Sequence, residues 1–75
     1  MGRLRLISGR EVCRILIRHG FVEVRRRGSH IIMQRRREGG TLTVPVPDLP
    51  EIRIWTLMSI IRQSEAPRTA FEIQG

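Results

Sequence analysis

Glycines divide the middle of the chain into three short segments, and this division constrains the fold more than any other feature. Gly28 and the pair Gly39-Gly40 separate the segments with links short enough for hairpins. The segments, rich in β-branched or aromatic residues, are 21–26, 29–35 and 41–46. Three such strands in succession predict an antiparallel meander, and Pro45 indicates that the third is an edge strand or the end of pairing.

Side-chain alternation predicts which face of the meander is buried. In the second strand, Ile31 and Met33 share one face, and the other face carries His30, Ile32 and Gln34. In the third strand the inward residues are Leu42, Val44 and Val46. We expect a tight turn at Arg27-Gly28 and a polar hairpin loop over residues 35–40.

A helix is predicted before the meander. Ser8-Gly9-Arg10-Glu11 has the pattern of a capping box, with Ser8 as N-cap, and the helix should run from Glu11 to about His19. Gly20 is the expected residue with positive φ that ends it. The apolar stripe consists of Val12, Ile15, Leu16 and His19. A basic ridge on the opposite face consists of Arg10, Arg14 and Arg18.

A second helix is predicted after the meander. A rigid loop with two prolines covers residues 47–51, and Thr56 is a plausible N-cap for a helix that ends at about Gln63. Residues 1–7 resemble a short lead-in, and residues 69–73 a further turn from which Phe71 folds back on the core. The order of helix, three strands and helix predicts a two-layer α+β domain with both helices on one face of the sheet. Its stability should depend on Leu16, Val44 and Ile60.

The charge of the chain indicates which kinds of partner it can bind. Seventy-five residues are enough for one domain, and the formal net charge is +7 with a pI near 11.7. All fourteen basic residues are arginine, which favours a polyanionic partner: nucleic acid first, and an acidic protein second. Genomic base composition explains the missing lysine equally well. The single cysteine excludes an internal disulfide, no zinc motif is present, and no apolar stretch is long enough for a membrane span, so we expect a reducing, cytoplasmic location.

One short stretch combines charge with a titratable group. Residues Arg25-Arg26-Arg27-Gly28-Ser29-His30 run three arginines into a glycine turn and then present an imidazole at the start of a strand. Together with the second arginine triplet, they form a candidate phosphate-binding set: Arg25, Arg26, Arg27, Gly28, Ser29, Arg35, Arg36 and Arg37. On these residues alone, a surface or capping role is the commoner one for the histidine. Solvated hairpin charge is the structural alternative for the arginines, but two triplets that border one strand favour a phosphate-facing role.

Three other conspicuous side chains have structural interpretations. His19 is expected to be a satisfied structural histidine at the end of the first helix, and Cys13 a small buried or half-buried hydrophobe. Trp55 is expected to pack against the domain rather than to stack on a base.

The chain resembles the HicA toxin family, also called YcfA-like proteins, over roughly residues 7–72. The resemblance rests on Ser8-Gly9-Arg10-Glu11, Ile15-Leu16, His19-Gly20-Phe21, Arg27-Gly28-Ser29-His30, Val44-Pro45 and residues 56–63. It implies a fold like that of a double-stranded-RNA-binding domain, with the order α-β-β-β-α. The whole chain, residues 1–75, would be one HicA-like domain with a core over 8–64 and a C-terminal turn and tail over 65–75.

The resemblance also implies an activity and partners. Members are mRNA interferases, endoribonucleases that cleave mRNA without a metal or cofactor and are covered by a HicB-type antitoxin. The family's functional histidine corresponds to His30. Leu49 stands where many relatives have a second histidine, and Trp55 where a glycine is common. The glycine usual after the second helix is replaced by Glu65 or Ala66.

Three functions are compatible with the sequence. The first is a HicA-like ribonuclease toxin in which His30 acts as a base or an acid, since an imidazole titrates near neutral pH. The second is a non-catalytic RNA-binding module of the same fold, favoured by Leu49 and Trp55. The third is a protein-interaction role in which the basic surface serves an acidic antitoxin.

Overall fold

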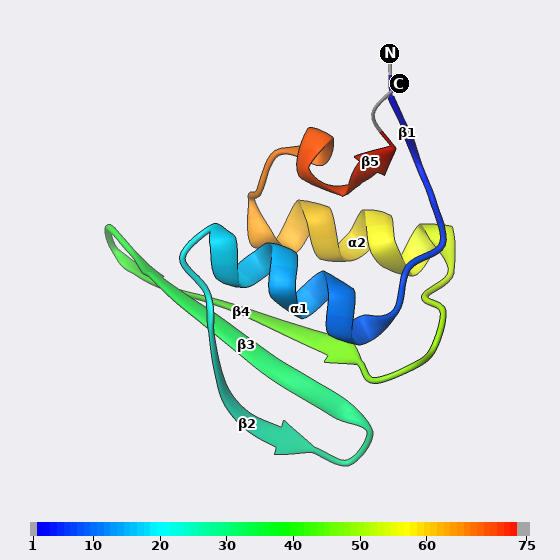
Figure 1. Cartoon of the computed structure of the whole chain (residues 1–75). Helices are drawn as coiled ribbons and strands as arrows, with labels where there is room; N and C mark the ends of the chain where they lie inside the picture. Colours follow the sequence, from blue (N-terminus) through cyan, green and yellow to red (C-terminus); the bar gives the residue numbers. More distant parts are fainter. Residues whose placement is uncertain (1, 74–75) are drawn as a thin grey trace.

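The computed structural model describes residues 2–73, and these form the predicted α-β-β-β-α domain with an additional pair of short strands (Figure 1). Met1, Gln74 and Gly75, which belong to the predicted lead-in and tail, lie outside the described residues. The elements are β1 (Arg3–Leu4), α1 (Gly9–Arg18), β2 (Val22–Arg27), β3 (His30–Arg37), β4 (Gly40–Pro47), α2 (Ile54–Ser64), the 3-10 turn η1 (Arg68–Phe71) and β5 (Glu72–Ile73).

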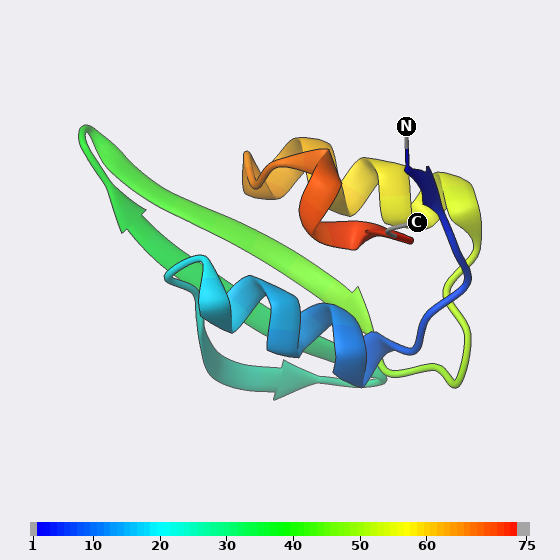
Figure 2. The same ribbon diagram turned by 45° about the horizontal axis from the view of Figure 1, so that its top comes forward.

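The meander is confirmed as an antiparallel sheet with strand order β2-β3-β4. Gly28 and Gly39 lie in its two turns with φ of +60° and +84°, a region that glycine adopts at low cost. Pro45 lies in β4, which is an edge strand as predicted. Both helices cover the same face of the sheet, and among residues 2–73 no helix or strand covers the other face (Figure 2).

The core fills the space between the helices and this face. Ile31, Met33, Val44 and Val46 are fully buried on the sheet side, as the alternation predicted. The residues whose loss was expected to matter most are also buried, namely Leu16, Val44 and Ile60. Burying a side chain of this size contributes about 1.5–3 kcal/mol, so each is a major contributor to a domain of only 75 residues.

The start of α1 follows its predicted cap, but its end differs from the prediction. The Ser8 hydroxyl accepts a hydrogen bond from the Glu11 backbone N–H at 3.0 Å, and Gly20 has φ of +93°. The Glu11 carboxylate pairs with Arg5 at 3.6 Å. His19 is exposed and does not belong to the core stripe, because the helix ends at Arg18 and His19 is already its C-cap.

The start of α2 corrects the prediction for Thr56. The helix begins at Ile54, with Arg53 as an N-cap that makes no side-chain capping bond, so Thr56 lies inside the first turn. The buried Ile52 fixes this earlier start, because its N–H donates to the Ile7 carbonyl at 2.8 Å and ties the chain to the segment before α1. That tie depends on a contact across 45 residues, which the local pattern does not contain.

The second arginine triplet is not a loop, contrary to the prediction for residues 35–40. Arg35, Arg36 and Arg37 continue β3 and pair with Leu42, Thr41 and Gly40 of β4. Extending the ladder satisfies backbone groups that a loop would leave to water, so that the turn shrinks to Glu38 and Gly39.

The short strands β1 and β5 pair with each other and were not predicted. Arg3 pairs with Ile73 and Leu4 with Glu72, which brings the two ends of the described chain together (Figure 1). Two-residue strands are too short to show a period, so the sequence gives no signal for them. Phe71, just before β5, is 1 % exposed and packs into the core as expected.

Gly9 allows the start of α1 to contact the end of β4. A Cβ at this position would lie 2.0 Å from the carbonyl oxygen of Pro47, and the Gly9 N–H donates to the Leu49 carbonyl at 2.9 Å. Only a residue without a side chain permits this approach of two backbones.

Replacing this glycine should therefore destabilise the domain. Gly9→Ala is expected to lower the free energy of unfolding by about 3 kcal/mol, because the backbone atoms that the methyl group meets cannot rotate away. Chemical denaturation monitored by circular dichroism measures the change. Gly40→Ala is the matched control, since nothing lies within 4 Å of its Cβ position, and its effect should stay below about 1 kcal/mol. Equal stability of Gly9→Ala and wild type would contradict the close contact.

Candidate functional site

The pleat of the sheet separates the arginines into two groups. Residues directly opposite each other in a register point to the same face, and Ile31 and Met33 mark the face under the helices. The other face, here called the open face, therefore carries the charged residues Arg25, Arg27, His30 and Arg36. All four are exposed. Gln34 and Thr43 lie between them on this face and are joined by a side-chain hydrogen bond of 3.2 Å.

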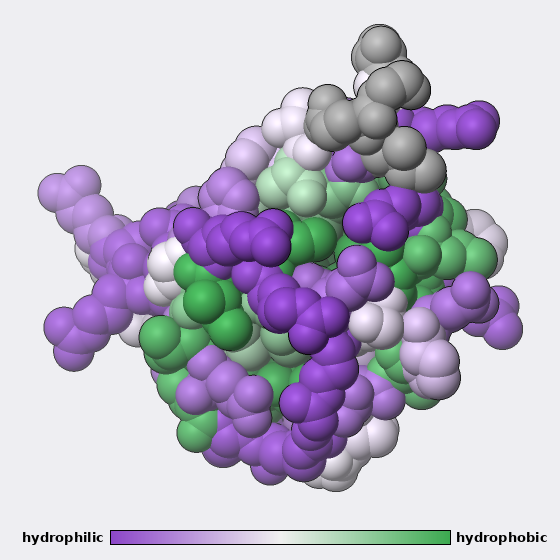
Figure 3. All heavy atoms as spheres, viewed as in Figure 1, coloured by the Kyte–Doolittle hydropathy of each residue, from purple (hydrophilic) through white to green (hydrophobic). Residues whose placement is uncertain are grey.

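The remaining arginines of the two triplets point toward the helices and have partners there. Arg26 pairs with Asp48 at 3.0 Å, and Arg37 pairs with Glu65 at the C-cap of α2. The guanidinium of Arg35 lies 5.6 Å from the centroid of the Phe21 ring. Hydrophilic side chains gather over the β3–β4 hairpin in Figure 3. Two arginines of this hairpin, Arg35 and Arg37, already contact other residues of the domain. The arginines of the predicted phosphate-binding set therefore fall into two groups. One group lies on the open face and consists of Arg25, Arg27 and Arg36. The other group contacts residues of the domain and consists of Arg26, Arg35 and Arg37.

Within residues 2–73, no ion pair or side-chain hydrogen bond involves Arg25, Arg27 or Arg36. Their charge is therefore available to an anion. A surface hollow of about 480 Å³ lies at the Arg36 end of the sheet and is lined by Gly20, Val22, Gln34, Arg35, Arg36 and Thr41.

His30 is the first residue of β3 and lies between the ends of the two neighbouring strands. Its register partners are Arg27 on β2 and Pro47 on β4, and its side chain is exposed on the open face. Side chains of directly opposite residues have Cβ atoms about 4.5–5.5 Å apart, so Arg27 is the cation nearest to the imidazole along the ladder. The turn before it has no side chain at Gly28, where no atom lies within 4 Å of a Cβ position. An approaching anion would meet His30 and Arg27 together.

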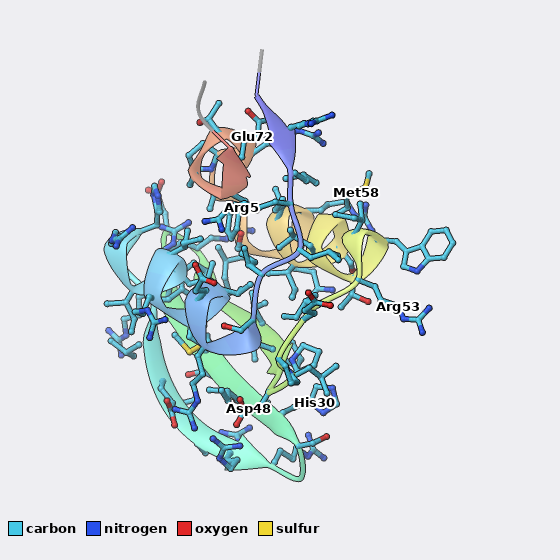
Figure 4. All side chains as sticks on the ribbon, turned by 45° about the vertical axis from the view of Figure 1, so that its right-hand side comes forward. Arg5, His30, Asp48, Arg53, Met58 and Glu72 are labelled. Carbon is cyan, nitrogen blue, oxygen red and sulfur yellow. The ribbon has the colours of Figure 1, made fainter. Side chains whose placement is uncertain are left out.

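Asp48 fixes this end of the sheet and was not singled out by the sequence. Its backbone N–H donates to the Ser29 carbonyl at 2.9 Å, and its carboxylate pairs with Arg26 of β2 at 3.0 Å and Arg10 of α1 at 3.4 Å. The hydrogen bond from Arg26 lowers the pKa of Asp48, and the charge of Arg10 adds to the effect. Figure 4 shows His30 and Asp48 at the same end of the sheet. The sequence held one signal for this role, since Asp48 is the single aspartate in a chain of net charge +7.

The lowered pKa of Asp48 predicts a loss of stability in acid. A carboxyl whose pKa is depressed by folding stabilises the protein above its unfolded pKa, and this contribution disappears as the pH falls through the folded value. The free energy of unfolding of wild type should therefore exceed that of Asp48→Asn near neutral pH. The difference should shrink as the pH falls below the ordinary value of 3.8 and be lost once the pH passes the lowered pKa of Asp48. Denaturation curves over a pH series measure it.

Glu38→Gln is the matched control for this measurement. Glu38 lies in the exposed turn between β3 and β4, and no ion pair of Glu38 is found within residues 2–73. Its pH profile should follow that of wild type. A difference between wild type and Asp48→Asn that persists unchanged to low pH would show that the carboxylate charge does not stabilise the fold.

No second imidazole accompanies His30. The chain has two histidines, and His19 lies at the C-terminal end of α1, whereas the N-terminal end of that helix contacts Pro47 and Leu49 near His30. A ten-residue helix spans about 15 Å, which separates the two rings by more than a proton transfer can bridge. Within residues 2–73 no group of three or more His, Cys, Asp or Glu is placed to hold a metal ion.

The two other conspicuous side chains have opposite outcomes. Cys13 is 7 % exposed and packs in the core as predicted, and its burial, with the nearby charge of Glu23, raises the pKa of the thiol. Trp55 does not pack against the domain, contrary to the prediction, because 76 % of it is exposed. The reason is the earlier start of α2, which places Trp55 on the outer side of the first helical turn.

Together these features define a small, strongly basic α+β domain in which the exposed His30 shares the open face with Arg25, Arg27 and Arg36. None of the helices in the described part of the chain is long and apolar enough to cross a membrane. Residues 9–66 match the family model described as HicA toxin of bacterial toxin–antitoxin, a region that begins with α1 and ends just after α2. The chain belongs to the HicA toxin family, and the toxin–antitoxin pairing of this family implies an antitoxin partner. No curated protein matches the chain.

Proposed function

We propose that the protein is a HicA-type toxin that cleaves mRNA as a metal-independent endoribonuclease, and that His30 is its catalytic residue. A HicB-type antitoxin would neutralise it, and the mRNA substrate would place the protein in the cytoplasm. The observation that carries the proposal is the position of His30, which is exposed on the open face directly opposite Arg27.

The charge of the open face supports binding of a single strand of RNA. Arg25 and Arg27 on β2 and Arg36 on β3 are exposed, on the same face as His30, and free of competing carboxylates. Guanidinium groups bind phosphate oxygens through two parallel hydrogen bonds. No helix or β-strand in the described part of the chain covers this face, so a single strand of RNA can lie along it. Ile32, on the same face between its partners Arg25 and Pro45, is only 4 % exposed and is covered by the side chains around it.

RNA cleavage of this kind requires two proton transfers, one from the attacking 2′-hydroxyl and one to the departing 5′-oxygen. The 2′-hydroxyl attacks the adjacent phosphorus, the P–O5′ bond breaks, and the products are a 2′,3′-cyclic phosphate and a free 5′-hydroxyl. Neutral His30 would accept the 2′-hydroxyl proton, or protonated His30 would donate one to the departing 5′-oxygen. Arg27, as the nearest cation across the strands, would stabilise the charge that develops on the phosphate oxygens.

A single imidazole limits the expected rate. Each positioned acid or base typically contributes about 10²–10⁴-fold, and with one histidine at the site water must supply the other transfer. Leu49, at the position of a second histidine in many relatives, is 49 % exposed and offers only its backbone carbonyl, which already accepts from Gly9. We therefore expect slow turnover. The same observation favours the alternative function, a non-catalytic RNA-binding module with the same open face.

Removing the imidazole should abolish cleavage without unfolding the protein. Purified wild type is expected to cleave single-stranded mRNA in the presence of EDTA, and His30→Ala should reduce the rate by at least about 10²-fold. Product analysis should find 2′,3′-cyclic phosphate ends. His19→Ala is the matched control, since His19 is also an exposed histidine but lies at the far end of α1. It should keep wild-type activity.

Two results would contradict this proposal. Full activity of His30→Ala, or activity lost on adding EDTA, would exclude the metal-independent histidine mechanism. Salt-dependent RNA binding with no cleavage and no growth arrest on induced expression would instead support the RNA-binding module.

The two groups of arginines should differ in their contribution to RNA binding. Replacing Arg25, Arg27 and Arg36 together by glutamine should lower the slope of log affinity against log salt by about 2, because each phosphate contact to single-stranded RNA contributes about 0.7. The matched control replaces Arg14, Arg18 and Arg62, which are exposed on the helices, with the same change in net charge. Fluorescence anisotropy with labelled RNA between 50 and 200 mM salt measures both slopes. Equal slopes for the two triple variants would exclude the open face as the RNA surface.

A further inference from the structure

Four exposed apolar side chains form a patch at the start of α2, here called the Trp55 patch. Leu6 is 51 % exposed, Ile54 38 %, Trp55 76 % and Met58 44 %. Ile54 and Trp55 lie four and three residues before Met58 on the helix, so the three share one surface. Figure 3 shows apolar atoms at the right-hand edge of the molecule, over the first turn of α2 and the segment after β1.

The Trp55 patch borders a shallow, open hollow. Leu6, Arg53, Ile54 and Trp55 line a hollow of about 450 Å³. Its base is fixed, because Ile7 and Ile52 are buried at 2 % and 1 % exposure and their backbones are joined by a hydrogen bond of 2.8 Å. Leu6 and Arg53 are the chain neighbours of this buried pair. The backbone that carries the lining side chains is therefore fixed before a partner binds, which lowers the ordering cost of docking there.

Charge favours an acidic protein as the occupant of this hollow. Arg53 borders it and has no ion pair within the described residues, and the chain carries a formal net charge of +7. A second copy of the chain would bring the same excess charge, which opposes association. RNA would meet three aliphatic or thioether side chains around a single indole, whereas single-strand sites interleave several aromatic residues with cations. Apolar anchors surrounded by complementary charge are typical of protein interfaces.

We propose that the Trp55 patch is a docking site for the antitoxin, which inserts an apolar side chain into the hollow and places acidic residues beside Arg53. This inference rests on the proposed pairing with an antitoxin and is independent of the catalytic role of His30. The Trp55 patch is close to His30 along the chain, since Pro47 pairs with His30 and only residues 48–52 separate Pro47 from Arg53. In Figure 4, His30, Arg53 and Met58 project from the same side of the molecule. An antitoxin anchored here would lie beside the open face.

The single tryptophan of the chain provides a selective probe. Protein grown with 5-fluorotryptophan has one ¹⁹F resonance, and an unlabelled partner adds none. The partner to use is the purified protein encoded by the reading frame that adjoins this gene. Its addition should shift the resonance and reduce the solvent isotope effect on it, because Trp55 becomes buried. Addition of single-stranded RNA should leave the resonance unchanged.

Variants test whether the patch contributes affinity. Trp55→Ser should raise the Kd for the antitoxin roughly 30-fold or more, as truncation of a central aromatic anchor does. Ile17→Ser is the matched control: Ile17 is an apolar residue of α1 that is 54 % exposed and lies outside the patch, and its Kd should match wild type. Circular dichroism checks that both variants fold, and the RNA cleavage rate of Trp55→Ser should equal that of wild type.

Each other outcome overturns the docking proposal. If Trp55→Ser binds the antitoxin with wild-type affinity, the docking proposal is wrong, and the proposed ribonuclease function is unaffected. A shift of the ¹⁹F resonance with RNA, with weaker RNA binding by Trp55→Ser, assigns the patch to base stacking. Concentration-dependent dimerisation that Trp55→Ser abolishes assigns it to a second copy of the chain. If the adjoining protein does not bind wild type at all, the proposed antitoxin pairing fails and the docking site fails with it.

Discussion

The backbone contact between the start of α1 and the loop after β4 holds the functional end of the molecule together. The Gly9 N–H donates to the Leu49 carbonyl at 2.9 Å, in a contact so close that a Cβ on Gly9 would lie 2.0 Å from the Pro47 oxygen. One residue away, the Asp48 N–H donates to the Ser29 carbonyl in the β2–β3 turn. Helix, loop and hairpin are thereby joined at the point where His30 emerges. The alternation within β3 places that histidine on the open face, and these contacts fix the neighbouring loop and turn.

Most of the acidic residues pair with arginines that lie off the open face, which leaves the open face positive. Four of the seven acidic residues form ion pairs with arginine among residues 2–73, namely Glu11, Asp48, Glu65 and Glu72. Glu65 does so from a left-handed conformation, φ of +58°, which costs a non-glycine residue about 1 kcal/mol. Net charge alone predicts a polyanion partner, but the placement of these pairs decides which surface can bind it.

Local features of the sequence predicted the architecture well. The N-cap at Ser8 and the glycine turns act within a few residues, so the first helix, the meander and the burial of Val44 followed from them. The roles of Asp48 and Trp55 did not follow. The contacts of Asp48 come from α1 and β2, and the exposure of Trp55 depends on where Ile52 is anchored to the segment before α1. Such contacts between distant segments leave no periodic signal.

A shift of register in β2 decides how many cations accompany His30. The register slips between Glu23 and Arg25, as in a β-bulge, and reverses the faces of the residues that follow. With a regular ladder, Arg26 alone would lie opposite His30 on the open face, and its two neighbours would point toward the helices. The slip instead places Arg25 and Arg27 on the open face and directs Arg26 to Asp48. One irregularity thus supplies both the cations beside the histidine and the ion pair that fixes the end of the sheet.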